Sequence, residues 1–200
     1  GKAVVAARLL WFALMAPMGA VMAGAEGPAD AAKQSLDQAA NDPTASLMAV
    51  QFQNVYAGAY HNLADEAGNT VLVRPVIPFK AGDLSHIARA TIPLVTQSPS
   101  GETGLGDSVI FDLIVFDQPW GRWGLGPVML LPTASQADLG AEKWAAGPAL
   151  GFVARQPGLM WGLFNQNLIS FAGDADRDEV KLSILQPILN ISLPHKWSLG

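Results

Sequence analysis

The chain has 200 residues, of which 50% are hydrophobic and only 14% are charged, well below the roughly 25% charged residues of a typical soluble domain. The net charge is −5, and the Lys and Arg residues are scattered without a basic patch, which argues against nucleic acid as a partner. There is no Cys, which excludes disulfides, thiolate zinc sites and lipid attachment at a cysteine.

The N-terminus has the layout of a secretory signal peptide. Lys2 and Arg8 precede an apolar run from Leu9 to about Ala23, which gives way to small residues. The alternative is a membrane anchor, but the run is shorter than the roughly 20 residues of a spanning helix and contains a proline and a glycine. We therefore predict that residues 1–25 are a signal peptide and that the protein is exported.

A short helical segment is predicted next, within residues 26–44. Residues 29–40 (ADAAKQSLDQAA) are rich in strong helix formers, and Pro43 ends the helix because the residue before a proline avoids the helical conformation. This segment is expected to lie in the periplasm or to plug or line a barrel.

From residue 45 onward the hydrophobic pattern has a period of two, as in strands between two environments. In the first strand Phe52 and Tyr56 alternate with Gln51 and Gln53. No helical period intervenes later. We predict strands at about 45–57, 70–80, 86–96, 105–117, 122–132, 144–155, 159–172 and 179–193, with a ninth beginning at Trp197.

The connections between these strands alternate strictly between long and short. The long ones are residues 61–69, 97–103, 133–143 and 173–178, and the short ones are 81–85, 118–121, 156–158 and 194–196. Outer-membrane barrels have long extracellular loops and short periplasmic turns, whereas a secreted sandwich has no reason to alternate. Residues 45–200 are therefore predicted to form an all-β, antiparallel, up-and-down transmembrane barrel of at least eight or nine strands.

Strand parity divides the side chains between the lumen and the lipid. The hairpin from Thr103 to Pro132 has one strongly apolar face, and we predict that its members face lipid: Val109, Phe111, Leu113 and Val115. The predicted lumen-facing residues are Gln51, Gln53, Arg74, Arg89, Asp112, Gln186 and Asn190. The seventh strand is ambiguous, because either Gln166 or the pair Asn165 and Asn167 could point inward.

Four Trp residues fall at or beside the short turns, where an interfacial aromatic girdle would lie: Trp120, Trp123, Trp161 and Trp197. Ordinary core packing is the alternative for each of them taken singly. Arg74 and Arg89, if both face inward, could pair with Asp112 as a lumenal constriction, or form an ion network that merely fills the barrel.

Several segments in order resemble one known family. They are Asn41 to Ala45 followed by Gln51 to Asn54, Thr103 to Asp107 (TGLGD), Gly121 to Pro127 (GRWGLGP), Leu139 to Pro148 and Gln186 to Asn190. From Ala29 to its end the chain resembles the outer-membrane transporters grouped as the "MetA-pathway of phenol degradation" family. The resemblance implies an outer-membrane barrel that admits small hydrophobic or aromatic compounds. It also implies further strands, so we expect this chain to be a fragment.

The sequence offers little for catalysis. His61, His86 and His195 are dispersed without metal-ligand spacing, and no Gly-x-Ser-x-Gly motif supports a hydrolase built on Ser85 or Ser170 with His86. The acidic loop at 173–179 lacks the glycine and glutamate spacing of an EF-hand. We predict no enzymatic activity, no metal and no cofactor.

The predicted function is an outer-membrane channel for small, hydrophobic or aromatic molecules, by passive or facilitated diffusion. The partners expected are outer-membrane lipid and a small solute, and the oligomeric state is left open. One alternative is a closed structural or adhesive barrel whose long loops bind partners. Another is a lipid-modifying barrel enzyme.

Overall fold

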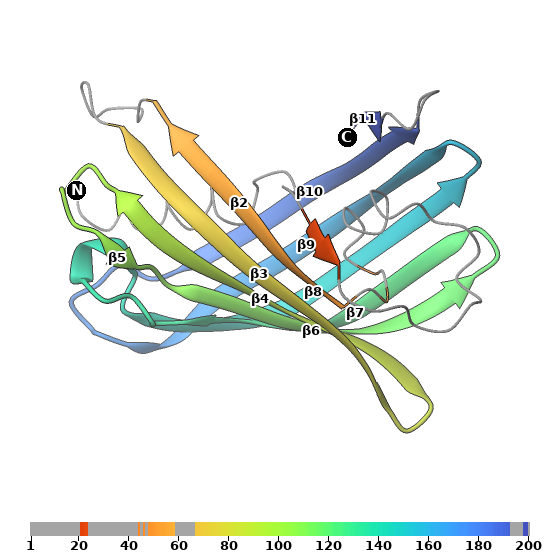
Figure 1. Cartoon of the computed structure of the whole chain (residues 1–200). Coiled ribbons are helices and arrows are strands. Elements are labelled where there is room, and N and C mark those ends of the chain that lie inside the picture. Colours follow the sequence, from red (N-terminus) through yellow and green to blue (C-terminus); the bar gives the residue numbers. More distant parts are fainter. Residues whose placement is uncertain are drawn as a thin grey trace.

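The computed structural model describes residues 21–23, 44, 46, 48–58, 67–192 and 198–199, and every structural statement below refers to these residues. They form one antiparallel sheet that curls into a half-barrel (Figure 1). The part of the chain described contains no helix long and apolar enough to cross a bilayer.

Eight long strands make up the sheet, and each pairs with the next long strand in chain order. They are β2 (Ala49–Ala57), β3 (Gly68–Ala81), β4 (Leu84–Gln97), β6 (Ser108–Gln118), β7 (Gly121–Leu131), β8 (Lys143–Gln156), β9 (Leu159–Gly173) and β10 (Lys181–Ser192). Three short strands complete it: β1 (Val21–Ala23) pairs with β2, β5 (Gly104–Leu105) with β4, and β11 (Ser198–Leu199) with β10. The short β5 lies between β4 and β6 in the sequence, but β4 pairs directly with β6.

The eight strands predicted between residues 45 and 193 are confirmed, and so is the alternation of the connections between them. The last short connection and Trp197, where the ninth strand was predicted to begin, lie outside the described residues, of which Ser198 and Leu199 form β11. Turns of two residues join β3 to β4, β6 to β7 and β8 to β9, whereas about ten residues separate β2 from β3, β4 from β6 and β7 from β8. The short turns gather at one end of the sheet and the long connections at the other (Figure 1). The third long connection contains a single 3-10 turn, η1 (Ala137–Leu139).

Two local features bend the sheet into its curl. The register shifts between Asn69 and Thr70 on β3 and between Trp144 and Ala145 on β8, and such irregularities bend a strand and increase its twist. Glycines let neighbouring backbones approach closely, as at Gly126, where an added Cβ would lie 1.7 Å from the Asp112 carbonyl oxygen.

Two predicted segments cannot be compared with the structure. The helical segment lies outside the described residues apart from Thr44 at its end, and so does the signal peptide apart from Val21–Ala23. Those three residues pair with Ala49 to Gln51 of β2.

Candidate functional site

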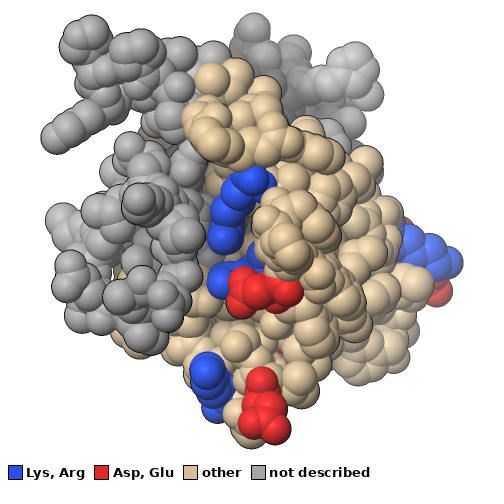
Figure 2. All heavy atoms as spheres, turned by 90° about the vertical axis from the view of Figure 1, so that its right-hand side faces the viewer, with Lys and Arg blue, Asp and Glu red and all other residues tan. Residues whose placement is uncertain are grey.

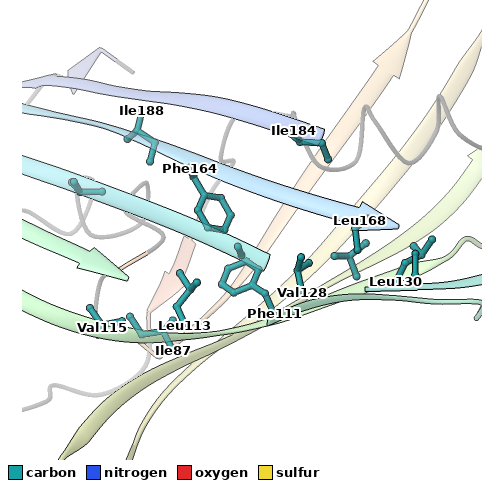
Figure 3. Packing of buried hydrophobic residues seen from close by; sticks show 14 of the residues in the cluster. Ile87, Phe111, Leu113, Val115, Val128, Leu130, Phe164, Leu168, Ile184 and Ile188 are labelled. Carbon is teal, nitrogen blue, oxygen red and sulfur yellow. The ribbon is translucent and has the colours of Figure 1, made fainter. Parts of the chain in front are cut away.

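The concave face of the sheet is lined by an apolar cluster. Its members come from six strands, β4 and β6 to β10, and include Ile87, Leu113, Val128, Leu130, Val153, Leu168 and Ile184. Figure 3 shows these side chains converging from several strands. The half-barrel is therefore packed with side chains on its inner side.

The predicted facing of β6 is wrong. Val109, Phe111, Leu113 and Val115 are 0 to 8% exposed and belong to the concave cluster, so they do not form the outer face of this strand. The Phe111 ring lies 5.2 Å from the ring of Phe164, which comes from β9 across the concave side (Figure 3). Such a contact between distant strands is possible only on the inner face. The prediction failed because it placed the polar residues of this strand, Asp112 among them, on the lumenal face.

Asp112 lies on the convex face, which corrects its predicted lumenal position. Its Oδ2 atom lies 2.9 Å from His86 Nδ1, and the His86 ring stacks on Phe79 with ring centroids 4.9 Å apart. The predicted constriction of Asp112 with two arginines is therefore not formed.

Those two arginines do lie together on the concave face, beside two amides. Arg74 is 4% exposed and donates from Nη1 to Gln53 Oε1 at 2.9 Å. Arg89 is 9% exposed, donates from Nη2 to Gln51 Oε1 at 3.0 Å, and has its guanidinium carbon 6.0 Å from the centre of the Phe111 ring. The predicted inward placement of these four polar residues agrees with the structure.

The other wall of the concavity is polar at a few points. Gln186 and Asn190 lie on the inner face of β10, as predicted, and Asn190 is 1% exposed. On β9 it is Gln166 that points inward, 3% exposed. Asn165 and Asn167 instead lie on the convex face, where they hydrogen-bond to each other and to Ser183 of β10. The ambiguity of this strand is thus resolved.

Arg122 ties the residues ahead of β2 to the opposite wall. From the inner face of β7 its Nη1 donates to the Thr44 carbonyl oxygen at 2.6 Å and to Ser46 Oγ at 3.1 Å. Its Nε donates to Asp117 Oδ1 at 2.6 Å. Thr44 is fully buried. The chain therefore enters β2 from inside the concavity, at the end with the short turns.

Two groups of aromatic side chains lie on the convex face beside the short turns. Phe116 stacks on Trp123 with centroids 4.6 Å apart, and Phe152 contacts both Trp120 and Trp161 edge to face, at 6.3 and 5.6 Å. These residues come from neighbouring strands, β6 to β9, and lie on the convex face. They therefore form a belt on the outside of the sheet and are not part of the concave cluster. The shared placement predicted for three of the tryptophans is confirmed, and Trp197 lies outside the described residues.

Aromatic side chains also occur on the convex face near the long connections. Tyr56, Trp144 and Phe171 are 65, 40 and 64% exposed. Between the two aromatic levels lie exposed aliphatic side chains, among them Ile77, Leu94, Ile110, Leu125, Leu150 and Leu185. Figure 2, which views the end with the short turns, shows mostly uncharged surface with a few small groups of charges.

Asp107 fastens the long connections to one another. Its carboxylate, 5% exposed, accepts from the backbone N–H groups of Ala134 and Ala141 at 3.2 and 2.6 Å. Arg177, in the connection after β9, donates to the carbonyl oxygens of Ala137 and Gly140 and pairs with Glu142 at 3.0 Å. The TGLGD motif is therefore the anchor of the loop from 132 to 142.

We expect replacement of Asp107 by alanine to lower the free energy of unfolding by about 2 kcal/mol, because two partly buried N–H groups would lose a charged acceptor. Asp107→Asn, which keeps one acceptor oxygen, should cost about half as much. Urea unfolding in detergent micelles, followed by Trp fluorescence, measures both. Glu102→Gln, an exposed carboxylate in the preceding connection, is the control and should unfold like the wild type.

Burial raises the pKa of the Asp107 carboxyl, against the opposing effect of its two backbone hydrogen bonds. A raised folded-state pKa means that the folded protein binds this proton more tightly than the unfolded chain. The contribution of Asp107 to stability should therefore be largest at low pH and fall as the pH rises from about 4 toward the raised value. Urea titrations across this range should show that slope in the wild type and lack it in Asp107→Asn; an unchanged slope contradicts the assignment.

The residues considered for hydrolysis are not assembled. Ser85 and His86 point to opposite faces of β4, and the Ser170 hydroxyl accepts from the Val180 N–H at the far end of the sheet. In the acidic loop, Asp174 accepts from the Asp176 N–H. Within the described ranges no three His, Asp or Glu residues are grouped as metal ligands.

Sequence reasoning missed several residues of the concave site. Phe111 was assigned to the wrong face, and Phe164 and Arg122 were not singled out. The register of β4 and β6 pairs Arg89 with Phe111 and so places both on one face, but this register is known only from the structure. No local signal marks Phe164 either, because its contact with Phe111 depends on the curl of the sheet.

In comparisons with known proteins, no family model, curated protein or solved structure matches the chain.

Proposed function

We propose that this chain forms the wall of an outer-membrane β-barrel that conducts small, hydrophobic or aromatic molecules by passive or facilitated diffusion. One observation carries the proposal. The convex face of the sheet presents exposed aliphatic side chains between two levels of aromatic residues, over strands of 9 to 15 residues. The polar residues on this face, such as Asp112 and Asn167, are hydrogen-bonded to neighbouring side chains.

This arrangement has the physical form of a lipid-facing surface. A soluble monomer rarely exposes a contiguous apolar patch larger than a few hundred Å², because water opposes it. Transmembrane strands need roughly 9 to 11 residues and carry aromatic girdles at both interfaces. The alternation of short turns and long connections supports the same assignment, with the short turns in the periplasm.

The concave face supports the choice of solute. Its apolar cluster and the Phe111 and Phe164 rings would contact an apolar molecule, while a few buried amides and arginines supply polar contacts. Nothing in this mechanism requires an energy source: the solute would diffuse along a mixed surface whose width and charge select it.

The test is reconstitution of the purified full chain into liposomes, followed by swelling assays with small neutral solutes. We expect swelling at least several-fold faster than in protein-free liposomes. No permeability to any small solute would contradict the channel and leave the closed structural barrel. A chain that stays soluble and monomeric without detergent would contradict the membrane assignment itself.

A further inference from the structure

We propose that the concave face holds a binding site for an organic anion with an apolar or aromatic body. The carboxylate of this anion would bind Arg89, and its body would lie against Phe111 and Phe164. This inference rests on the proposed channel function. It goes beyond passage of hydrophobic molecules, because it names a charged head group and the residue that selects it.

The main support for an anion site is the positive charge of Arg89. The side chain is 9% exposed, and among the described residues it donates to the Gln51 amide oxygen and lies over the Phe111 ring, both of them neutral. Its Nε atom is buried without a hydrogen-bond partner. In the described ranges no Asp or Glu forms an ion pair with Arg89, since Asp112 lies on the other face and Asp117 binds Arg122. A buried guanidinium is costly without an anion, and Arg binds carboxylates through two parallel hydrogen bonds.

The surroundings of Arg89 define the rest of the ligand. Arg74, on the adjacent strand, lies on the same face and donates to the Gln53 amide oxygen. The Phe111 ring lies beneath Arg89 and contacts the Phe164 ring at 5.2 Å, so a row of two rings, 8 and 3% exposed, extends from the guanidinium toward β9. Two residues beyond Phe164, Gln166 has a buried Oε1 atom without a partner. An anion with an attached ring or short alkyl chain matches this order of charge and apolar surface.

The experiment uses the full chain in planar lipid bilayers, with benzoate as the probe anion and benzylammonium as the cation of similar size. Reversal potentials under a concentration gradient give the permeability ratio, and we expect benzoate to be favoured about tenfold. Arg89→Gln should lower benzoate permeability about tenfold with chloride conductance changed much less. Arg89→Lys should retain part of the preference, because it keeps the charge without the bidentate geometry. Lys80→Gln, an exposed lysine beside the turn from β3 to β4, is the control and should behave as wild type.

The outcomes separate the two proposals. Absence of current for every ion would contradict the channel function and the anion site together. Current with equal permeability to benzoate and benzylammonium in the wild type would overturn the anion site alone, whatever the variants do. An Arg89→Gln protein that migrates as folded in unheated gels and keeps the full benzoate preference would also overturn it.

Discussion

Replacing Gly126 by alanine is expected to lower the free energy of unfolding by about 3 kcal/mol, or to prevent the hairpin of β6 and β7 from forming. The new Cβ would lie 1.7 Å from the Asp112 carbonyl oxygen, a backbone atom that cannot rotate away. Phe111 pairs with Val128 and Ile114 pairs with Leu125, and the pairing of the two strands is interrupted between these two pairs, where Gly126 lies. The strands can therefore yield only by separating, which would remove hydrogen bonds and concave packing together.

Urea unfolding in detergent micelles measures this loss, and heat-modifiable gel migration shows whether any folded protein remains. Gly58→Ala is the matched control, because its Cβ would lie at an ordinary contact distance of 3.6 Å from the Tyr56 ring. Equal stability of the two variants would show that β6 and β7 do not approach as closely as described.

The second large effect concerns the convex face. Leu125 lies near the middle of β7, is 44% exposed and pairs with the apolar residues Ile114 and Leu150. If this face contacts lipid, Leu125→Arg should destabilise the folded protein by about 2 to 4 kcal/mol, the cost of a cation at the bilayer midplane. If the face contacts water, a surface substitution should change stability by no more than about 0.5 kcal/mol.

Unfolding from phospholipid vesicles in guanidinium chloride measures the cost directly. Gln118→Arg, at the exposed end of β6 beside a short turn, is the control, because a charge near the interface costs about 0 to 1 kcal/mol. A Leu125→Arg protein as stable as the Gln118→Arg protein would contradict a lipid-facing convex surface.

The strands and the alternation of their connections could be predicted from the sequence, because both depend on local patterns: a period of two and the composition of the turns. The positions of Gln51, Arg74 and Arg89 followed from the same parity. The faces of β6 did not, because Phe111 and Asp112 are adjacent and parity alone does not say which belongs inside. That choice depends on Phe164, which lies on a strand about 50 residues later and reaches Phe111 only when the sheet curls. Likewise, the role of Asp107 depends on the fold of a later loop.

The most direct test of the account is the lipid exposure of the convex face, and the absence of Cys makes it simple. Single cysteines would be placed at Leu125, at Leu150 and at the exposed Asp178 of the last long connection, and each would carry a nitroxide label in phospholipid vesicles. Labels at 125 and 150 should be accessible to oxygen and protected from a water-soluble nickel complex, whereas the label at 178 should show the reverse. Nickel accessibility at 125 and 150 equal to that at 178 would contradict the membrane-embedded half-barrel.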